Sequence, residues 1–418
     1  MRRLKLLRVD PAYGSRIPGV EGLRALAASS ILLFHCWLYS SPDKTHANLG
    51  PLSRYLFPQL PLGVTLFFAL SGFLLYRPFV AAVMRDRERP SLWRYLRNRA
   101  LRILPAYWFI LLVVALGLQT ALVYDPAGNW GPGQLTDPGI LARNAFFVQD
   151  YSGRTLLTGI GPAWSLAIEA VFYLTLPLLV LLAGALAKTA RTRRGRRIAA
   201  LSPAALMLLL GIAGKVADFL IGVQPLKSIL YWSFLANADK FAFGMAVAVL
   251  FVDAKDQLLR LPRWWPVAAM AGLLAVAIPT AKFTANNAFA GDGSNFIYNT
   301  LMALACALLL ALVVLPGHAG PRLRLVRLLE TRVLVGTGLV SYSLFLWHEP
   351  LVYWLSRHGL TLAGTAGFFF NLLLLATTAG ILSALSYRWV ELPALRRKAR
   401  QRPGPIEAVP AYQIEAAP

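Results

Sequence analysis

Residues Leu62–Met84 read LGVTLFFALSGFLLYRPFVAAVM, a run of 23 residues with one charged side chain, Arg77. About 20 apolar residues in a helix cross the hydrocarbon core of a bilayer, so this stretch predicts a transmembrane helix. The whole chain has the same character: 57% of its 418 residues are hydrophobic, 15% are charged, and the mean hydropathy is +0.55. An ordinary globular chain contains about 25% charged residues. The composition therefore predicts an all-α, polytopic bundle of transmembrane helices.

Ten stretches are long and apolar enough to span a bilayer: 19–40, 62–84, 103–123, 162–185, 200–222, 230–252, 264–281, 297–315, 333–356 and 363–385. Most Lys and Arg residues lie in alternate connections, namely 1–18, 85–102, 188–197, 253–263, 316–332 and 386–402. Basic connections remain on the cytoplasmic side of a membrane. We therefore expect both termini to be cytoplasmic, in a multi-pass protein of the inner (plasma) membrane.

This topology predicts three regions of the chain. Residues 1–18 form a basic cytoplasmic segment, residues 19–393 form the transmembrane domain, and residues 394–418, which are rich in proline, form a disordered cytoplasmic tail. We interpret 188–197 as a plain basic loop between two spans.

The charge and cysteine content exclude several classes of function. The chain has 42 Lys and Arg against 19 Asp and Glu, a net charge of +23. Because the basic residues are bunched between apolar runs, cytoplasmic loops explain them better than a nucleic-acid-binding surface does. Membrane lipids, and no nucleic acid, are the expected partners. Cys36 and Cys306 both lie within apolar runs, so a disulfide, a zinc site or another metal site is not expected. The sequence has no Walker loop, Rossmann fingerprint or Gly-x-Ser-x-Gly elbow, and no permanently bound cofactor is expected.

The first span contains two ionisable residues, Arg24 and His35, at depths where such side chains are costly and usually functional. Eleven residues separate them, which is close to a whole number of helical turns. Both side chains are therefore predicted on one helix face, about 16 Å apart along the axis. The alternative is an Arg that extends to the membrane interface and a His that is hydrogen-bonded inside the bundle.

Three other spans also contain polar residues. In 333–356, His348 and Glu349 precede Pro350, which should kink the helix and leave a backbone carbonyl free, a break that is tolerated where it lines a cavity. The alternative is a kink that serves only packing, with His348 facing outward. In 162–185, Ser165 and Glu169 are four residues apart and share a helix face, either in a functional site or as a helix-capping contact. In 230–252, the adjacent Asp239 and Lys240 are expected to be a neutralised internal pair without a functional role.

A cluster of arginines precedes the third span at positions 94, 97, 99 and 102. Arg99 and Arg102 are three residues apart, on one helix face. Guanidinium groups bind phosphates through paired, charge-assisted hydrogen bonds. The cluster thus predicts either a phosphate-binding site or a surface for anionic lipids.

At these residues the chain resembles the bacterial membrane acyltransferase-3 family, the O-acyltransferases of surface glycans and of some antibiotics. The similarity lies in Gly22-Leu-Arg24 with His35, in GVTLFFALSGF at 63–73, in RNRALRILPAY at 97–107, in WSLAIE at 164–169, in SYSLFLWH at 341–348 and in YRWVELP at 387–393. Each motif alone has low specificity. Their common order along ten predicted spans makes the resemblance strong.

The resemblance implies acyl-CoA, with acetyl-CoA as the default, as a donor that arrives from the cytoplasm. It also implies that Arg24, Arg99 and Arg102 bind the phosphates of the donor and that His35 is essential. A neutral imidazole is suited to take the proton of an attacking hydroxyl, so His35 is predicted as a general base or, as a second mechanism, as a carrier of the acyl group.

Glu169 is expected either to orient the imidazole of His35 or to bind the acceptor. Four residues are expected to line the substrate site: Trp164, Ser165, Trp347 and His348. Many relatives carry an additional extracytoplasmic domain at the C-terminus, and its absence from this sequence would leave acceptor choice to the membrane domain and its short loops.

The acceptor remains open at this stage. A hydroxyl of a cell-envelope glycan or glycolipid is the first hypothesis, and a small secondary metabolite of the macrolide type is the second. Kinked helices with buried charges also fit a transporter, and buried pairs that serve only packing fit a lipid-binding scaffold. Consumption of acyl-CoA would separate the enzyme from both.

Overall fold

A computed structural model of the chain describes residues 16–41, 47–124, 130–287, 294–315 and 321–399. Most of the predicted cytoplasmic N-terminal segment and the tail beyond Ala399 lie outside these residues. The prediction of a disordered tail from residue 394 is wrong at its start, because Leu392–Ala399 form the short helix α14.

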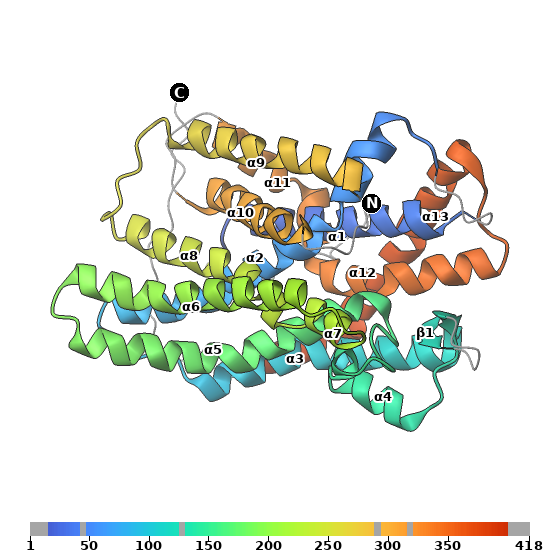
Figure 1. Cartoon of the computed structure of the whole chain (residues 1–418), viewed down its shortest axis with the longest axis horizontal. Helices are drawn as coiled ribbons and strands as arrows, with labels where there is room; N and C mark the ends of the chain where they lie inside the picture. Colours follow the sequence, from blue (N-terminus) through green and yellow to red (C-terminus); the bar gives the residue numbers. More distant parts are fainter. Residues whose placement is uncertain (1–15, 42–46, 125–129, 288–293, 316–320, 400–418) are drawn as a thin grey trace, which may run out of the picture.

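The described chain is a bundle whose long helices run roughly along the longest axis of the molecule (Figure 1). The long helices are α1 (Val20–Tyr39), α2 (Leu62–Met84), α3 (Leu92–Leu112), α5 (Trp164–Thr189), α6 (Arg193–Leu220), α8 (Ala238–Lys255), α9 (Trp265–Asn287), α10 (Ser294–Val314), α12 (Arg332–Arg357) and α13 (Gly364–Ser386). Short helices are α4 (Pro138–Ala145), α7 (Leu226–Tyr231) and α11 (Pro321–Leu329). The predicted all-α class is confirmed.

By length and composition, nine helices of the described chain could cross a membrane. The one predicted span outside that set is α12, which is 26 residues long but carries Ser341, Ser343, His348 and Glu349 near its middle. This helix packs lengthwise against α1 and α13 and is buried along its middle. With α12 included, the long helices correspond to the ten predicted spans.

Several predicted boundaries are wrong. Helix α3 begins at Leu92 rather than at 103, because the arginine-rich segment is itself helical. The predicted span also runs too far, since Gln119 has a left-handed backbone and residues Ala121–Tyr124 (β1) instead pair with Trp130–Gly133 (β2). The predicted loop at 188–197 is too long, because α5 continues to Thr189 and α6 begins at Arg193, where the Thr192 hydroxyl accepts a hydrogen bond from the Gly195 N–H.

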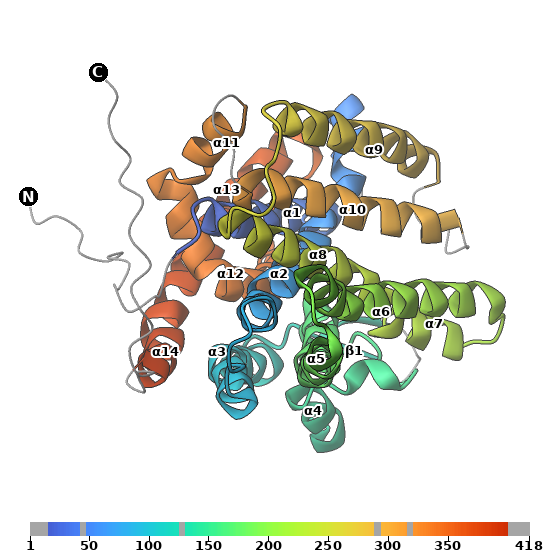
Figure 2. The ribbon, with the colours of Figure 1, turned by 90° about the vertical axis from the view of Figure 1, so that its left-hand side faces the viewer.

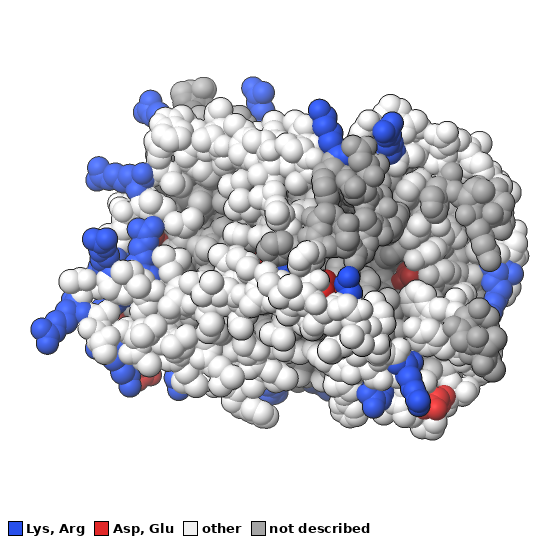
Figure 3. Space-filling view, in the orientation of Figure 1, with Lys and Arg blue, Asp and Glu red and all other residues white. Residues whose placement is uncertain are grey.

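Basic side chains are concentrated at one end of the bundle. Figure 3 shows Lys and Arg gathered where α5 turns into α6 and where α8 ends. Asp256 forms ion pairs there with Arg85 (2.8 Å) and Arg193 (3.0 Å). This distribution is the three-dimensional counterpart of the charge alternation in the sequence.

At the other end of the bundle, the chain between α3 and α5 folds as the β1–β2 hairpin followed by α4. Asn144 is fully buried and donates a hydrogen bond to the Thr158 hydroxyl. Burial raises the pKa of the Asp150 carboxyl to about 7, although the backbone N–H of Leu157 donates to it. This connection is a folded segment that covers the end of the bundle.

Helices α2 and α8 lie at the centre of the bundle in the end-on view (Figure 2). They approach through a reciprocal pair of glycines. A Cβ added at Gly72 would lie 2.3 Å from the Phe241 carbonyl oxygen, and one added at Gly244 would lie 1.9 Å from the Ala69 carbonyl oxygen. Small residues of this kind let membrane helices pack backbone to backbone.

We expect Gly244→Ala to lower the free energy of unfolding by about 1–3 kcal/mol, because the added methyl must push α2 and α8 apart. A methyl added at Gly380 of α13 would meet no atom within 4 Å. Gly380→Ala should therefore be neutral or slightly stabilising, since alanine favours a helix over glycine. Thermal unfolding in detergent measures the stability of both variants. An equal loss of stability in Gly244→Ala and Gly380→Ala would contradict the close-contact argument.

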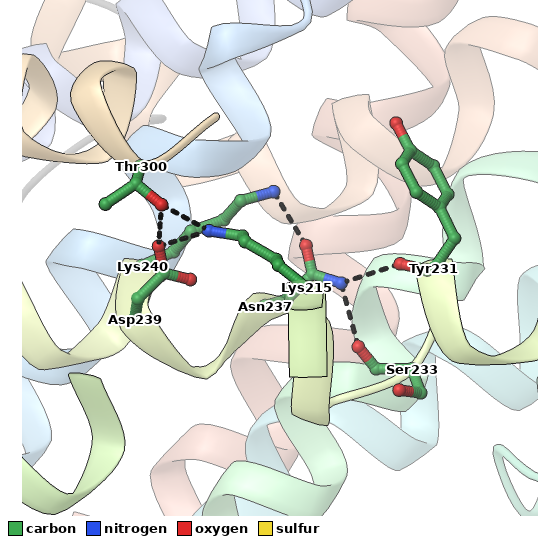
Figure 4. Close-up of polar contacts among 7 residues, drawn as sticks. All are labelled: Lys215, Tyr231, Ser233, Asn237, Asp239, Lys240 and Thr300. Atoms are coloured by element: carbon green, nitrogen blue, oxygen red, sulfur yellow. Dashed lines mark hydrogen bonds and ion pairs between the residues drawn. The ribbon is translucent and has the colours of Figure 1, made fainter. Parts of the chain in front are cut away.

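A buried polar cluster joins α6, α8 and α10 (Figure 4). Asp239 accepts hydrogen bonds from Lys215 and from Thr300, the second at 3.0 Å, and Lys240 donates to Asn237 at 2.6 Å. The predicted Asp239–Lys240 pair is thus replaced by an Asp239–Lys215 pair. Adjacent residues on a helix point about 100° apart, which directs the two side chains to different partners.

Candidate functional site

The site is built on the close packing of α1 against α12. At Gly338 of α12 an added Cβ would lie 2.0 Å from the Glu21 carbonyl oxygen of α1. Glycine at this position lets the two backbones approach, so that polar side chains from the two helices meet inside the bundle.

Two cross-helix contacts follow from this packing. Nε of Arg24 donates to the Ser341 hydroxyl at 3.3 Å, and Nδ1 of His35 lies 2.7 Å from Nε2 of His348. His348 is fully buried, whereas His35 is only partly buried. The predicted alignment of Arg24 and His35 is consistent with these contacts, because both residues meet the same neighbouring helix.

The three arginines predicted to bind phosphates line one cavity. Arg24 comes from α1, while Arg99 and Arg102 come from α3. The remaining wall is largely apolar and includes Phe67 of α2 and Phe345 of α12. A cavity that combines cationic groups with a largely apolar wall is suited to an amphipathic ligand that carries phosphate.

The arginines differ in how far their donors are already used. Arg102 forms an ion pair with Glu391 at 2.7 Å, and the Ser343 hydroxyl donates to the other oxygen of that carboxylate at 2.6 Å. Nε of Arg99, in contrast, is buried and has no hydrogen-bond partner. A buried donor without a hydrogen-bond partner lowers stability. Of the three arginines, Arg99 therefore has the most to gain from a bound anion.

The His35–His348 pair lies next to this cavity. The ring of Phe345, which lines the cavity, is 5.7 Å from the ring of His348, centre to centre. The ring of His35 also lies beside that of Tyr39, with centres 5.7 Å apart and planes 11° from parallel. The imidazole pair is therefore separated from the arginine-lined space by about one aromatic side chain.

Glu169 lines the arginine cavity, and its carboxylate accepts a hydrogen bond from Ser71. Among the described contacts, the hydrogen-bond partner of His35 is His348 rather than Glu169. The hypothesis that Glu169 orients the imidazole of His35 is thus not supported by the geometry. The place expected for a carboxylate is taken by a second imidazole.

The other predicted substrate residues have separate positions. Ser165 lines the cavity, and its hydroxyl donates to the Pro162 carbonyl at 2.9 Å. Trp164 packs edge-on against Trp232, with ring centres 4.6 Å apart. Trp347 is buried and donates its indole N–H to the Ser386 hydroxyl of α13 at 2.9 Å, so its side chain faces α13 instead of the cavity.

Sequence reasoning assigned no role to Ser71 or Glu391, which belong to the site. Ser71 is one of the few polar residues in a largely apolar span, and Glu391 lies in the YRWVELP motif. Polar residues in apolar surroundings are the signal that identifies both. Within the described chain, no group of three or more His, Cys, Asp or Glu could hold a metal ion.

Comparison with known proteins gives matches over most of the chain. O-acetyltransferase OatA of Staphylococcus aureus (strain COL) is 25% identical over 405 residues, which cover 94% of this chain and 59% of OatA. Nodulation protein 10 of Rhizobium leguminosarum bv. viciae is 25% identical over 400 residues, which cover 90% of this chain and 92% of that protein. The chain therefore spans less than two thirds of the length of OatA. No solved structure matches it.

The family profile described as "Acyltransferase domain" matches residues 17–386, from just before α1 to the end of α13. This range contains every predicted site residue, and it confirms the resemblance drawn from the sequence motifs. The chain belongs to the acyltransferase-3 family of membrane proteins.

Proposed function

We propose that this protein is an integral membrane O-acyltransferase that moves an acyl group, most simply acetyl, from cytoplasmic acyl-CoA to a hydroxyl of a cell-envelope glycan or glycolipid. The observation that carries the proposal is the single cavity lined by Arg24, Arg99 and Arg102 beside the His35–His348 pair. The name of the relative OatA, an O-acetyltransferase, supports the acyl group and the oxygen acceptor.

In this mechanism the guanidinium groups of the cavity bind the phosphates of the donor, and its pantetheine arm runs past the apolar wall toward His35. The imidazole of His35 takes the proton of the acceptor hydroxyl while that oxygen attacks the thioester carbonyl. The C–S bond then breaks, and the CoA thiolate takes the proton back from the imidazolium. The products are the ester and free CoA, and no further reactant is required.

The proposal is tested with purified protein in nanodiscs, radiolabelled acetyl-CoA and an extract of cell-envelope glycans. Label should move to the extract, with release of one free CoA thiol for each ester formed. A panel of small hydroxylated metabolites serves as the competing acceptor set. Folded protein that consumes no acyl-CoA with any acceptor, yet moves an acylated product across the membrane, would establish the transporter instead.

Arg99 gives the clearest test of donor binding, because Arg102 also neutralises Glu391 and its loss would disturb the fold. We expect Arg99→Ala to raise KM for acyl-CoA by about 10- to 100-fold, since a hydrogen bond to a charged group contributes about 1.5–3 kcal/mol. Arg94, an exposed arginine on the same helix, provides the matched control.

Steady-state kinetics over a range of acetyl-CoA concentrations measures both variants. Arg94→Ala should leave KM unchanged. An unchanged KM in Arg99→Ala, or an equal rise in both variants, would show that the cavity does not bind donor phosphates and that the arginines act only on the membrane surface.

A further inference from the structure

The contact between His35 and His348 indicates which ring nitrogen of His35 can act as a base. Nδ1 of His35 and Nε2 of His348 are 2.7 Å apart, a hydrogen-bonding distance. One of these nitrogens must carry the proton and the other must supply a lone pair. Two imidazolium rings could not form this contact, because each would present an N–H to the other.

The other nitrogen of His348 decides the direction of that hydrogen bond. Nδ1 of His348 lies 3.3 Å from the Leu344 carbonyl oxygen, one turn earlier on α12. A carbonyl only accepts, so Nδ1 of His348 carries the proton and its Nε2 carries a lone pair. That lone pair accepts from Nδ1–H of His35. Because a neutral imidazole has one N–H, Nε2 of His35 is left with the basic lone pair.

The carboxylates near this pair are engaged elsewhere. Glu349 follows His348, but one of its oxygens accepts from the Tyr353 hydroxyl at 2.8 Å and the other lies against Gly161. Glu169 accepts from Ser71. The described contacts therefore leave the orientation of His35 to an imidazole.

We propose that His348 is a positioning residue that holds His35 in the Nδ1–H tautomer, so that Nε2 of His35 is the nitrogen that takes the proton of the acceptor. The inference rests on the proposed role of His35 as the base. It assigns to His348 the function that a carboxylate has in a Ser-His-Asp triad, where the partner fixes the tautomer and orientation of the imidazole.

The burial of the two rings agrees with this division of roles. His348 is fully buried, so it has no surface with which to meet a substrate, while His35 keeps part of its surface accessible. The sequence-based expectation that His348 lines the acceptor site is replaced by a role that acts through His35. Tyr39, one turn later on α1, has its ring 5.7 Å from the His35 ring, centre to centre, and nearly parallel to it.

Nitrogen-15 NMR of histidine-labelled protein in nanodiscs tests the tautomer directly. The chain has five histidines, and single substitutions assign their signals. At mildly alkaline pH we expect His35 and His348 both to be protonated at Nδ1 and unprotonated at Nε2, which is the less common form of free imidazole. A wild-type spectrum in which His35 carries its proton on Nε2 overturns the proposal without any measurement of activity.

Substitution of His348 tests whether it sets that tautomer. His348→Phe removes the acceptor nitrogen but keeps a planar ring, and we expect His35 to move to the Nε2–H form and kcat to fall by about 100-fold, with KM for the donor unchanged. His348→Gln, whose amide oxygen can accept the same hydrogen bond, should recover part of kcat. A His35 signal that stays Nδ1–H in His348→Phe contradicts the proposal.

His358 gives a matched control. It ends the same helix, and its Nδ1 lies 2.8 Å from the Trp354 carbonyl one turn earlier, but the residue is exposed. His358→Gln should change neither the His35 signal nor kcat. The two proposals fail separately: a wild-type protein whose His35 is not protonated at Nδ1 contradicts the role of His348, whereas folded protein that consumes no donor contradicts the transferase.

Discussion

Alanine in place of His35 is expected to lower the rate of acyl transfer by about 100- to 10,000-fold, the range that a well-placed general base supplies. The substitution removes the imidazole beside the arginine cavity but leaves the three guanidinium groups in place. Binding of acyl-CoA should therefore persist. Single-turnover transfer of label from saturating acetyl-CoA, together with equilibrium binding of the donor, separates the two effects.

The variant will also lose some stability, because Nε2 of His348 remains buried without its hydrogen bond, at a cost of about 1–3 kcal/mol. Thermal unfolding must confirm that the protein is folded at the assay temperature. Cys36 provides the control at the same level of α1, since it is fully buried and adjacent. Cys36→Ala should keep full activity, which would also exclude the Cys36 thiol as acyl carrier.

Full transferase activity in folded His35→Ala would refute His35 as the base and as the acyl carrier. Two mechanisms on His35 can also be distinguished. If His35 carries the acyl group, label is bound to wild-type protein before acceptor is added; if the transfer is direct, no label is bound. Quenched reactions without acceptor decide between these two mechanisms.

The sequence predicted the helices best where an apolar run has clear limits. Helix α2 has the predicted bounds, and α12 differs by one residue at each end. It failed where basic residues continue a helix beyond the membrane, as at Leu92 of α3 and Arg193 of α6. Hydropathy indicates which residues suit the hydrocarbon layer, whereas arginine also favours helices in water. The end of the apolar run and the end of the helix therefore need not coincide.

For the site, the sequence identified the important residues better than their partners. The 11-residue spacing placed Arg24 and His35 on one face, and both contact α12. The pairing of His35 with His348 depends on which helices are neighbours. The same is true of Glu169, whose partner is Ser71 of α2. Periodicity determines the face of a helix, but the neighbour that covers it is set by packing of the whole bundle.

The Asp239–Lys215 pair also depends on which helices are neighbours and could not be predicted from the sequence. Breaking this pair gives the largest change in stability that we expect. Asp239 is fully buried and paired with Lys215, and the buried Lys240 bonds Asn237 nearby, so the three charged groups carry a net charge of +1 (Figure 4). Asp239→Asn would leave two buried cations without a counter-charge. We expect it to lower the free energy of unfolding by about 3–5 kcal/mol, the cost of breaking one partner of a buried ion pair.

A double-mutant cycle in mixed detergent micelles tests this expectation. Lys215→Met alone should cost less than Asp239→Asn, because Lys240 remains to balance the carboxylate. The double variant restores the original net charge and should recover much of the stability, since a neutral replacement of a buried pair is tolerated better than half of it. Lys188→Met, on the exposed last turn of α5, should change stability by no more than about 0.5 kcal/mol. If the two single substitutions add in the double variant, the lysine and the aspartate are not coupled, and the helices α6 and α8 are held by packing alone.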